Sequence, residues 1–203
     1  QSRWRPELPI AHILPHWNWL SRVGEITPVH VFTSGDEAEL FLNGQSLGKK
    51  KKAEFEYRIR WDDVKYQAGE LKAVAYKNGK IWAEETLKTT DKPAKILAAA
   101  DRSEIKADGE DLAFITVKIT DKNGLMVPDA NNKINFKIEG LGEIVATDNG
   151  NPADLVSFAS HERAAFNGMA LVIIRANKGY KGKMKLIITS DGLDKAVVEI
   201  ESN

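Results

Sequence analysis

The sequence predicts an all-β protein in which two β-sandwich domains follow an extended, aromatic-rich segment at the start of the chain. Asn-Gly dipeptides recur along the chain, apolar and polar residues alternate between them, and no stretch shows helical periodicity. Asn and Gly tolerate the positive φ that both central positions of a type I′ hairpin turn require. The five dipeptides therefore predict tight hairpins in antiparallel sheet: Asn43-Gly44, Asn78-Gly79, Asn123-Gly124, Asn149-Gly150 and Asn167-Gly168.

The sequence predicts an extended lead-in segment over residues 1–24. Proline is frequent enough here to prevent a regular helix, because it lacks the backbone N–H and clashes with the preceding turn. We expect the aromatic side chains of this segment to pack on whatever lies beside it. The residues concerned are Trp4, Trp17 and Trp19, with Pro6, Pro9 and Pro15.

The first β-sandwich is expected over residues 25–90. Phe55–Trp61 reads as its clearest strand, since the odd positions are apolar or aromatic and the even positions are charged. Such alternation is typical of a strand with one buried face and one wet face. Six or seven strands in this length suit a small sandwich. The other apolar positions with this spacing are Val29, Val31, Ala38, Leu40, Leu42, Leu71, Ala73, Ala75, Ile81 and Ala83.

Residues 91–93 predict a short linker, because the polar run there ends in proline. The second sandwich is expected over residues 94–203, with turn signals every 8 to 12 residues or so. The stretch Leu171–Ile174 is apolar at every position, which predicts a central strand. The other expected strands contain Ile115, Val117 and Ile119; Ile134, Phe136 and Ile138; Met184, Leu186 and Ile188; and Ala196, Val198 and Ile200.

The composition excludes several classes of function. Of 203 residues, 29 are Lys or Arg and 29 are Asp or Glu, so the zero net charge gives no pull toward nucleic acid or anionic membrane. No apolar run reaches the roughly 18 to 20 residues of a membrane span, and the first residues show no signal peptide. Cysteine is absent, which excludes disulfides and thiolate chemistry. Four histidines without an HExxH pattern predict no metal site, and we expect no cofactor.

The block His12–Trp19 is the most unusual part of the sequence. Trp17 and Trp19, with His16, have the flat rings on which a sugar stacks. Large aromatics more often serve as packing anchors. We therefore favour interdomain packing by Trp4, Trp17 and Trp19 and keep carbohydrate binding as the alternative.

Three further groups have a functional and a structural interpretation. The run Lys49–Lys52 suggests a site for acidic polysaccharide, but nearby carboxylates favour a solvated loop. Asp148–Asp154 offers oxygen ligands for calcium without EF-hand spacing, so a turn is favoured. Neighbouring carboxylates, such as Asp62-Asp63 and Glu84-Glu85, would point to opposite faces of a strand and could not flank one glycosidic bond. The sequence thus predicts no catalytic residue.

Several motifs resemble glycoside hydrolase family 2 β-galactosidases of the Bacteroides type. His12–Trp19, Val29–Thr33 and Glu39–Gly48 are similar to the segment that follows the catalytic barrel of those enzymes. Later motifs resemble their further C-terminal immunoglobulin-like domain, and the order is the same throughout. These are Ala100–Leu112, Asp148–Pro152 and Arg163–Leu171. Leu20-Ser21-Arg22 departs from the proline-glycine turn expected there, which leaves the local loop shape open.

The resemblance implies two tandem immunoglobulin-like sandwiches from the C-terminal portion of a multidomain, retaining β-galactosidase. The two catalytic glutamates would belong to a (β/α)₈ barrel, which needs about 200 residues or more and has no counterpart in this chain. The expected partner is that barrel, in the same polypeptide, with a second subunit or a glycan as further partners. The resemblance also implies a periplasmic or extracellular location in a Gram-negative bacterium. An adhesion-type immunoglobulin-like module remains as an alternative.

Overall fold

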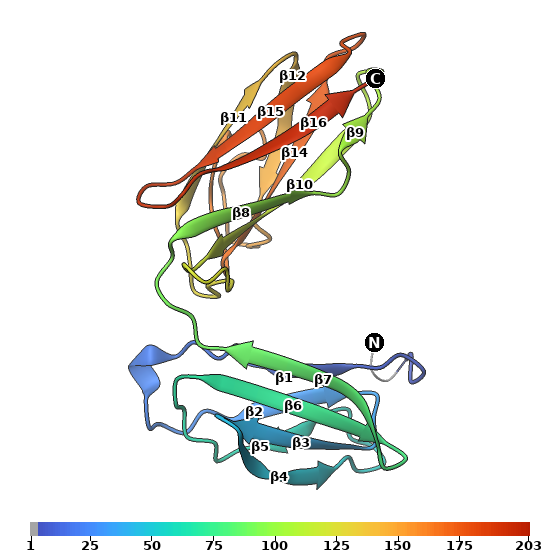
Figure 1. Cartoon of the computed structure of the whole chain (residues 1–203), viewed down its shortest axis with the longest axis vertical. Helices are drawn as coiled ribbons and strands as arrows, with labels where there is room; N and C mark the ends of the chain where they lie inside the picture. The colour runs from blue at the N-terminus through green and yellow to red at the C-terminus, as the bar shows by residue number, and fades with distance from the viewer. Residues whose placement is uncertain (1–3) are drawn as a thin grey trace. The chain divides into compact units, whose positions relative to one another are not determined.

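The computed structural model describes residues 4–203, so the first three residues of the expected lead-in lie outside the description. The chain divides into two compact units, with Thr89 the last residue of the first and Thr90 the first residue of the second. Each unit is a pair of packed β-sheets, and the described chain is helical only in the 3₁₀ turn η1, Leu20–Arg22. The prediction of two all-β sandwiches is confirmed (Figure 1).

The first unit pairs a three-stranded sheet in the order β1-β2-β5 with a four-stranded sheet in the order β4-β3-β6-β7. All strand pairs in it are antiparallel, and this arrangement is an immunoglobulin-like sandwich. Every second residue of β3 is buried, as the alternation predicts. The strands are β1 Ala11–Leu14, β2 Val29–Thr33, β3 Glu37–Leu42, β4 Gln45–Lys51, β5 Ile59–Trp61, β6 Glu70–Lys77 and β7 Lys80–Lys88.

Two predictions for this unit are wrong at their boundaries. The lead-in does not end at residue 24, because Ala11–Leu14 pairs with β2 and is a strand of the sandwich itself. The strand expected over Phe55–Trp61 is regular only over Ile59–Trp61. The carbonyl of Thr33, at the end of β2, accepts a hydrogen bond from the Lys52 ammonium at 2.9 Å instead of extending the ladder. Phe55 is consequently 83% exposed.

Three of the five Asn-Gly dipeptides form the predicted turns. Asn43, Asn78 and Asn167 have φ near 50°, and the glycine after each also has positive φ, as a type I′ turn requires. The prediction is wrong at Asn123 and Asn149, where only the following glycine has positive φ. At both places an aspartate side chain accepts nearby backbone N–H groups and shapes a wider loop.

The second unit pairs a sheet in the order β12-β14-β10-β8 with a sheet in the order β13-β11-β15-β16-β9. Strand β14 lies between β12 and β10, which confirms the prediction that Leu171–Ile174 is central. The alternating buried residues of β10 fill the space between the sheets: Ala113, Ile115, Val117 and Ile119. The strands are β8 Lys95–Ala100, β9 Glu104–Ile105, β10 Leu112–Thr120, β11 Lys133–Glu139, β12 Gly142–Asp148, β13 Glu162–Ala164, β14 Met169–Ala176, β15 Gly182–Thr189 and β16 Ala196–Ser202.

Candidate functional site

The two tryptophans of the aromatic block do not form a stacking platform. Trp17 is only 1% exposed and belongs to the core of the first unit, where its ring lies 4.9 Å from that of Tyr66. Its indole N–H donates to the carbonyl of Gln67 at 2.9 Å. The predicted platform is therefore wrong, because a ring inside the core cannot present a face to a sugar. The expected interdomain role of Trp17 is wrong for the same reason.

Trp19 and His16 pack on each other at the border of this core. Their rings stack with centroids 4.4 Å apart, and the Trp19 indole N–H donates to the carbonyl of His16 at 2.8 Å. Trp19 packs half-buried against the core of the first unit. Trp4, by contrast, is 85% exposed. Among the three tryptophans, Trp4 is the one whose face is free to pack against another part of a longer polypeptide.

The lysine run is engaged in local contacts along the β3–β4 hairpin. Lys49 pairs with Glu37 at 3.0 Å and lies over the ring of Tyr76. Lys50 donates to the carbonyl of Arg60 at 2.7 Å. Burial lowers the pKa of Lys52, whose ammonium binds the end of β2. These contacts favour the structural interpretation over a site for acidic polysaccharide.

Most of the remaining carboxylate candidates also have structural partners. Glu84 pairs with Lys72 at 2.9 Å, while Glu85 accepts a hydrogen bond from the backbone N–H of Ile13. Asp108 accepts the N–H groups of two following residues and its pKa is lowered by them. Within residues 4–203 no three His, Asp or Glu side chains group as metal ligands would. No helix in the described part of the chain is long and apolar enough to span a membrane.

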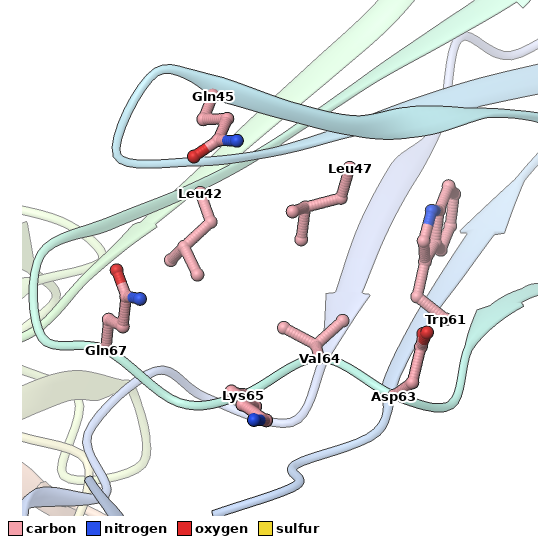
Figure 2. A pocket seen from close by; sticks show the side chains of 8 residues that line it. All are labelled: Leu42, Gln45, Leu47, Trp61, Asp63, Val64, Lys65 and Gln67. Atoms are coloured by element: carbon pink, nitrogen blue, oxygen red, sulfur yellow. The ribbon is translucent and has the colours of Figure 1, made fainter. Parts of the chain in front are cut away.

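A pocket opens on the first unit between the β3–β4 hairpin and the segment that follows β5. It has a volume of about 230 Å³. Figure 2 shows Leu42, Gln45 and Leu47 of the hairpin facing Val64 and Gln67 across it. Trp61 lies at one end, above Asp63, and Lys65 lies on the same segment. The pocket lining thus combines apolar side chains with amide, carboxylate and ammonium groups.

Hydrogen bonds between distant segments hold both walls of the pocket. The turn at Asn43 places Gln45 directly after it, and the Asn43 side chain bonds the carbonyl of Ala68 and the N–H of Glu70. The opposite wall is held at Gln67, whose carbonyl accepts the Trp17 indole N–H. Thr27 donates its N–H to the carbonyl of Val64 at 2.7 Å. The buried Trp17 therefore supports the pocket without lining it.

Trp61 brings the one unusual polar group to this pocket. The residue is 2% exposed, and its indole N–H has no hydrogen-bond partner among the described residues. The Lys50 ammonium lies 5.2 Å from the centroid of the Trp61 ring. From the sequence, Trp61 was predicted only as a strand residue, and Asp63 was considered only as half of a carboxylate pair. No local signal joins them to Gln45, because the two walls come from separate parts of the chain.

Two family models match this chain, one on each unit. The model for the glycoside hydrolase family 2 C-terminal domain 5 matches residues 96–199. A second model, for a domain of unknown function (DUF4982), matches residues 24–83. These two matches fall on the second and the first unit respectively.

Individual relatives are much longer than this chain. The β-galactosidase BoGH2A of Bacteroides ovatus is 42% identical over 100% of this chain, which covers 23% of that protein. A β-glucuronidase of Formosa agariphila is 30% identical over 69% of this chain, or 14% of its own length. A family 2 glycosyl hydrolase structure from Bacteroides cellulosilyticus has a TM-score of 0.90 and 33% identity, covering 96% of this chain and 29% of that one.

Proposed function

Since this chain belongs to glycoside hydrolase family 2, we propose that it is a non-catalytic, C-terminal accessory portion of a β-galactosidase. The observation that carries the proposal is the alignment of the entire chain with 23% of the B. ovatus β-galactosidase. The bond-breaking step would belong to a catalytic barrel elsewhere in the same polypeptide. There a retaining mechanism would use two carboxyl groups about 5 to 5.5 Å apart.

The contacts of the carboxylates support the assignment of catalysis to another domain. A general acid needs a raised pKa, whereas every aspartate whose pKa departs from its usual range has it lowered: Asp101, Asp108, Asp121 and Asp154. Glu7 also has a lowered pKa, because the guanidinium of Arg5 bonds it. Groups held in the charged form suit structural pairing better than proton donation.

Docking on the catalytic barrel is the structural role that we propose for the first unit. Its early residues expose apolar side chains that a soluble domain gains nothing by presenting: Trp4 is 85% exposed, Val23 64% and Leu20 62%. Burial of these side chains against the barrel would stabilise the parent enzyme. The parent would act in the periplasm or outside the cell of a Gram-negative bacterium, with a second subunit as the alternative docking partner.

Turnover assays test the proposal directly. This chain should not hydrolyse an aryl β-galactoside or an aryl β-glucuronide, while a longer polypeptide with the barrel should hydrolyse the galactoside. Turnover by this chain above the buffer rate would overturn the proposal. Faster turnover of the glucuronide by the longer polypeptide would instead assign the parent to the activity of the F. agariphila relative.

A further inference from the structure

The buried indole N–H of Trp61 is the starting point for a binding site in the pocket of the first unit. Buried indole N–H groups usually have a partner, because leaving a donor unsatisfied costs free energy. None is present for this group within residues 4–203. Figure 2 shows the nitrogen edge of the ring turned toward Leu47 and the interior of the pocket. A ligand oxygen in the pocket would supply the missing acceptor.

The other polar side chains around the pocket are also available to a ligand. In the described part of the chain, the side chains of Gln45, Asp63 and Gln67 have no hydrogen bond or ion pair. Together with Trp61 they offer donors, acceptors and one carboxylate. Most polar residues on the neighbouring strands are instead paired, as Asp62 is with Arg60 at 3.0 Å. Unpaired hydrogen-bond donors and acceptors therefore lie together around this pocket.

We propose that this pocket binds a single neutral monosaccharide unit. A sugar hydroxyl both donates and accepts, so it can accept from the Trp61 N–H and donate to the Asp63 carboxylate. The C–H face of the ring would lie on Leu42, Leu47 and Val64, and the polar part of the lining would bind its hydroxyls. This pocket is distinct from the carbohydrate site that the sequence suggested at His16, Trp17 and Trp19.

Size and charge restrict the ligand to this class. A volume of about 230 Å³ is below the roughly 300 to 1,000 Å³ of sites for drug-sized ligands, so one ring fits and an oligosaccharide would extend into solvent. Asp63 and Lys65 contribute one charge of each sign. The pocket therefore has no excess positive charge to recognise a uronic acid or a phosphate. Asn43 and Trp17 hold both walls in place, so binding requires only the local movement that opens the buried Trp61 N–H to the ligand.

Nuclear magnetic resonance of the whole chain tests the proposal. The chain has five tryptophans and hence five side-chain indole signals, and the Trp61 signal would be assigned as the one lost in Trp61→Phe. Titration with D-galactose, D-glucose, D-mannose or D-xylose should shift the Trp61 signal in a saturable way for at least one sugar, with millimolar affinity. D-glucuronate should bind more weakly than the best neutral sugar.

Asp63→Asn and Asp62→Asn form a matched pair for the same titration. Loss of the charge-assisted hydrogen bond in Asp63→Asn should weaken binding by about tenfold, whereas Asp62→Asn, outside the pocket, should leave it unchanged. Gln67→Ala should also weaken binding. The proposal is overturned if none of the neutral sugars shifts the Trp61 signal up to hundreds of millimolar, if both aspartate variants bind equally, or if glucuronate binds best. None of these outcomes bears on the accessory role, which the turnover assays decide separately.

Discussion

Arg163 organises one whole loop of the second unit through a single side chain. That side chain is 1% exposed and pairs with Asp154 at 3.0 Å. It also donates to the carbonyls of Thr147, Val156 and Ser157 at 2.7 to 3.0 Å. The Val156 N–H and the Arg163 guanidinium lower the pKa of Asp154. The guanidinium replaces the strand hydrogen bonds that an irregular loop cannot make.

We predict that Arg163→Met destabilises the second unit by about 3 to 5 kcal/mol, because it leaves a partly buried carboxylate and several carbonyls without a donor. Arg175→Met is the control, since its exposed pair with Glu143 should contribute no more than about 1 kcal/mol. Urea unfolding followed by circular dichroism measures both. Equal effects for the two variants would show that Arg163 has no special role.

Trp61 has a structural role whether or not the pocket binds a ligand. We predict that Trp61→Ala destabilises the first unit by about 3 to 5 kcal/mol, because the buried ring would leave a cavity. Trp4→Ala should leave the melting temperature of this chain unchanged, since Trp4 is exposed. A melting temperature unchanged in Trp61→Ala would contradict the burial of the ring.

The hairpin turns show how a local signal can acquire a long-range function. Asn43 and Asn78 have the same left-handed backbone, but only the Asn43 side chain bonds a distant segment, at Ala68 and Glu70. A Cβ on Gly69 would also collide with the Asn43 side chain, so both positions are sterically matched. The first turn thus fixes a hairpin and one wall of the pocket together.

We predict that Asn78→Ala costs about 1 to 2 kcal/mol from backbone strain alone, and that Asn43→Ala costs about 1 to 2 kcal/mol more from the lost hydrogen bonds. Chemical denaturation monitored by tryptophan fluorescence measures the difference. If Asn43→Ala and Asn78→Ala were equally destabilising, the side-chain clamp would contribute nothing.

At the scale of the whole molecule, the two units differ in their response to acid. The four aspartates with a lowered pKa all lie in the second unit. For Asp101 and Asp121 burial acts to raise the pKa, but backbone N–H donors, joined at Asp101 by the Arg102 guanidinium, more than offset it. Burial first, and then the Arg58 charge, lower the pKa of His30 in the first unit.

These shifts predict two stages of acid destabilisation. A lowered His30 pKa gives stability that is complete above its ordinary value of 6.5 and is lost as the pH falls through the folded-state pKa. The aspartates contribute stability that is lost only below about pH 4. All tryptophans lie in the first unit, so fluorescence should report the first stage and circular dichroism the second.

The His30→Gln variant is the control for this pH profile. It should flatten the fluorescence-detected decline between about pH 7 and pH 5 while leaving the acid transition of the second unit unchanged. Coincident transitions by both probes, unaffected by His30→Gln, would contradict the assignment.

Separation of the chain at the boundary between Thr89 and Thr90 tests its division into two units. Each unit has its own buried core, so we predict that each piece folds cooperatively when expressed alone. The predicted linker at residues 91–93 lies beside this boundary and stays a prediction until such pieces are made. Loss of a cooperative melting transition in either piece would show that the units depend on each other.

The sequence by itself determined the features that depend on neighbouring residues. Alternation gave the buried faces of β3 and β10, a continuous apolar run gave the central position of β14, and backbone preference gave the turns at Asn78 and Asn167, because all three act within a few residues. The motifs that carry the family resemblance are also short contiguous runs. They can be identified without knowing which strands pair.

Only the tertiary structure decided what depends on residues far apart in the chain. Whether Trp17 meets solvent or the core, where the strand before Trp61 begins, and which side chains Arg163 reaches all follow from strand pairing and sheet packing. The pocket belongs to this group, since a hairpin and a later segment form its two walls. Composition and periodicity describe one segment at a time, whereas a site is a relation between segments.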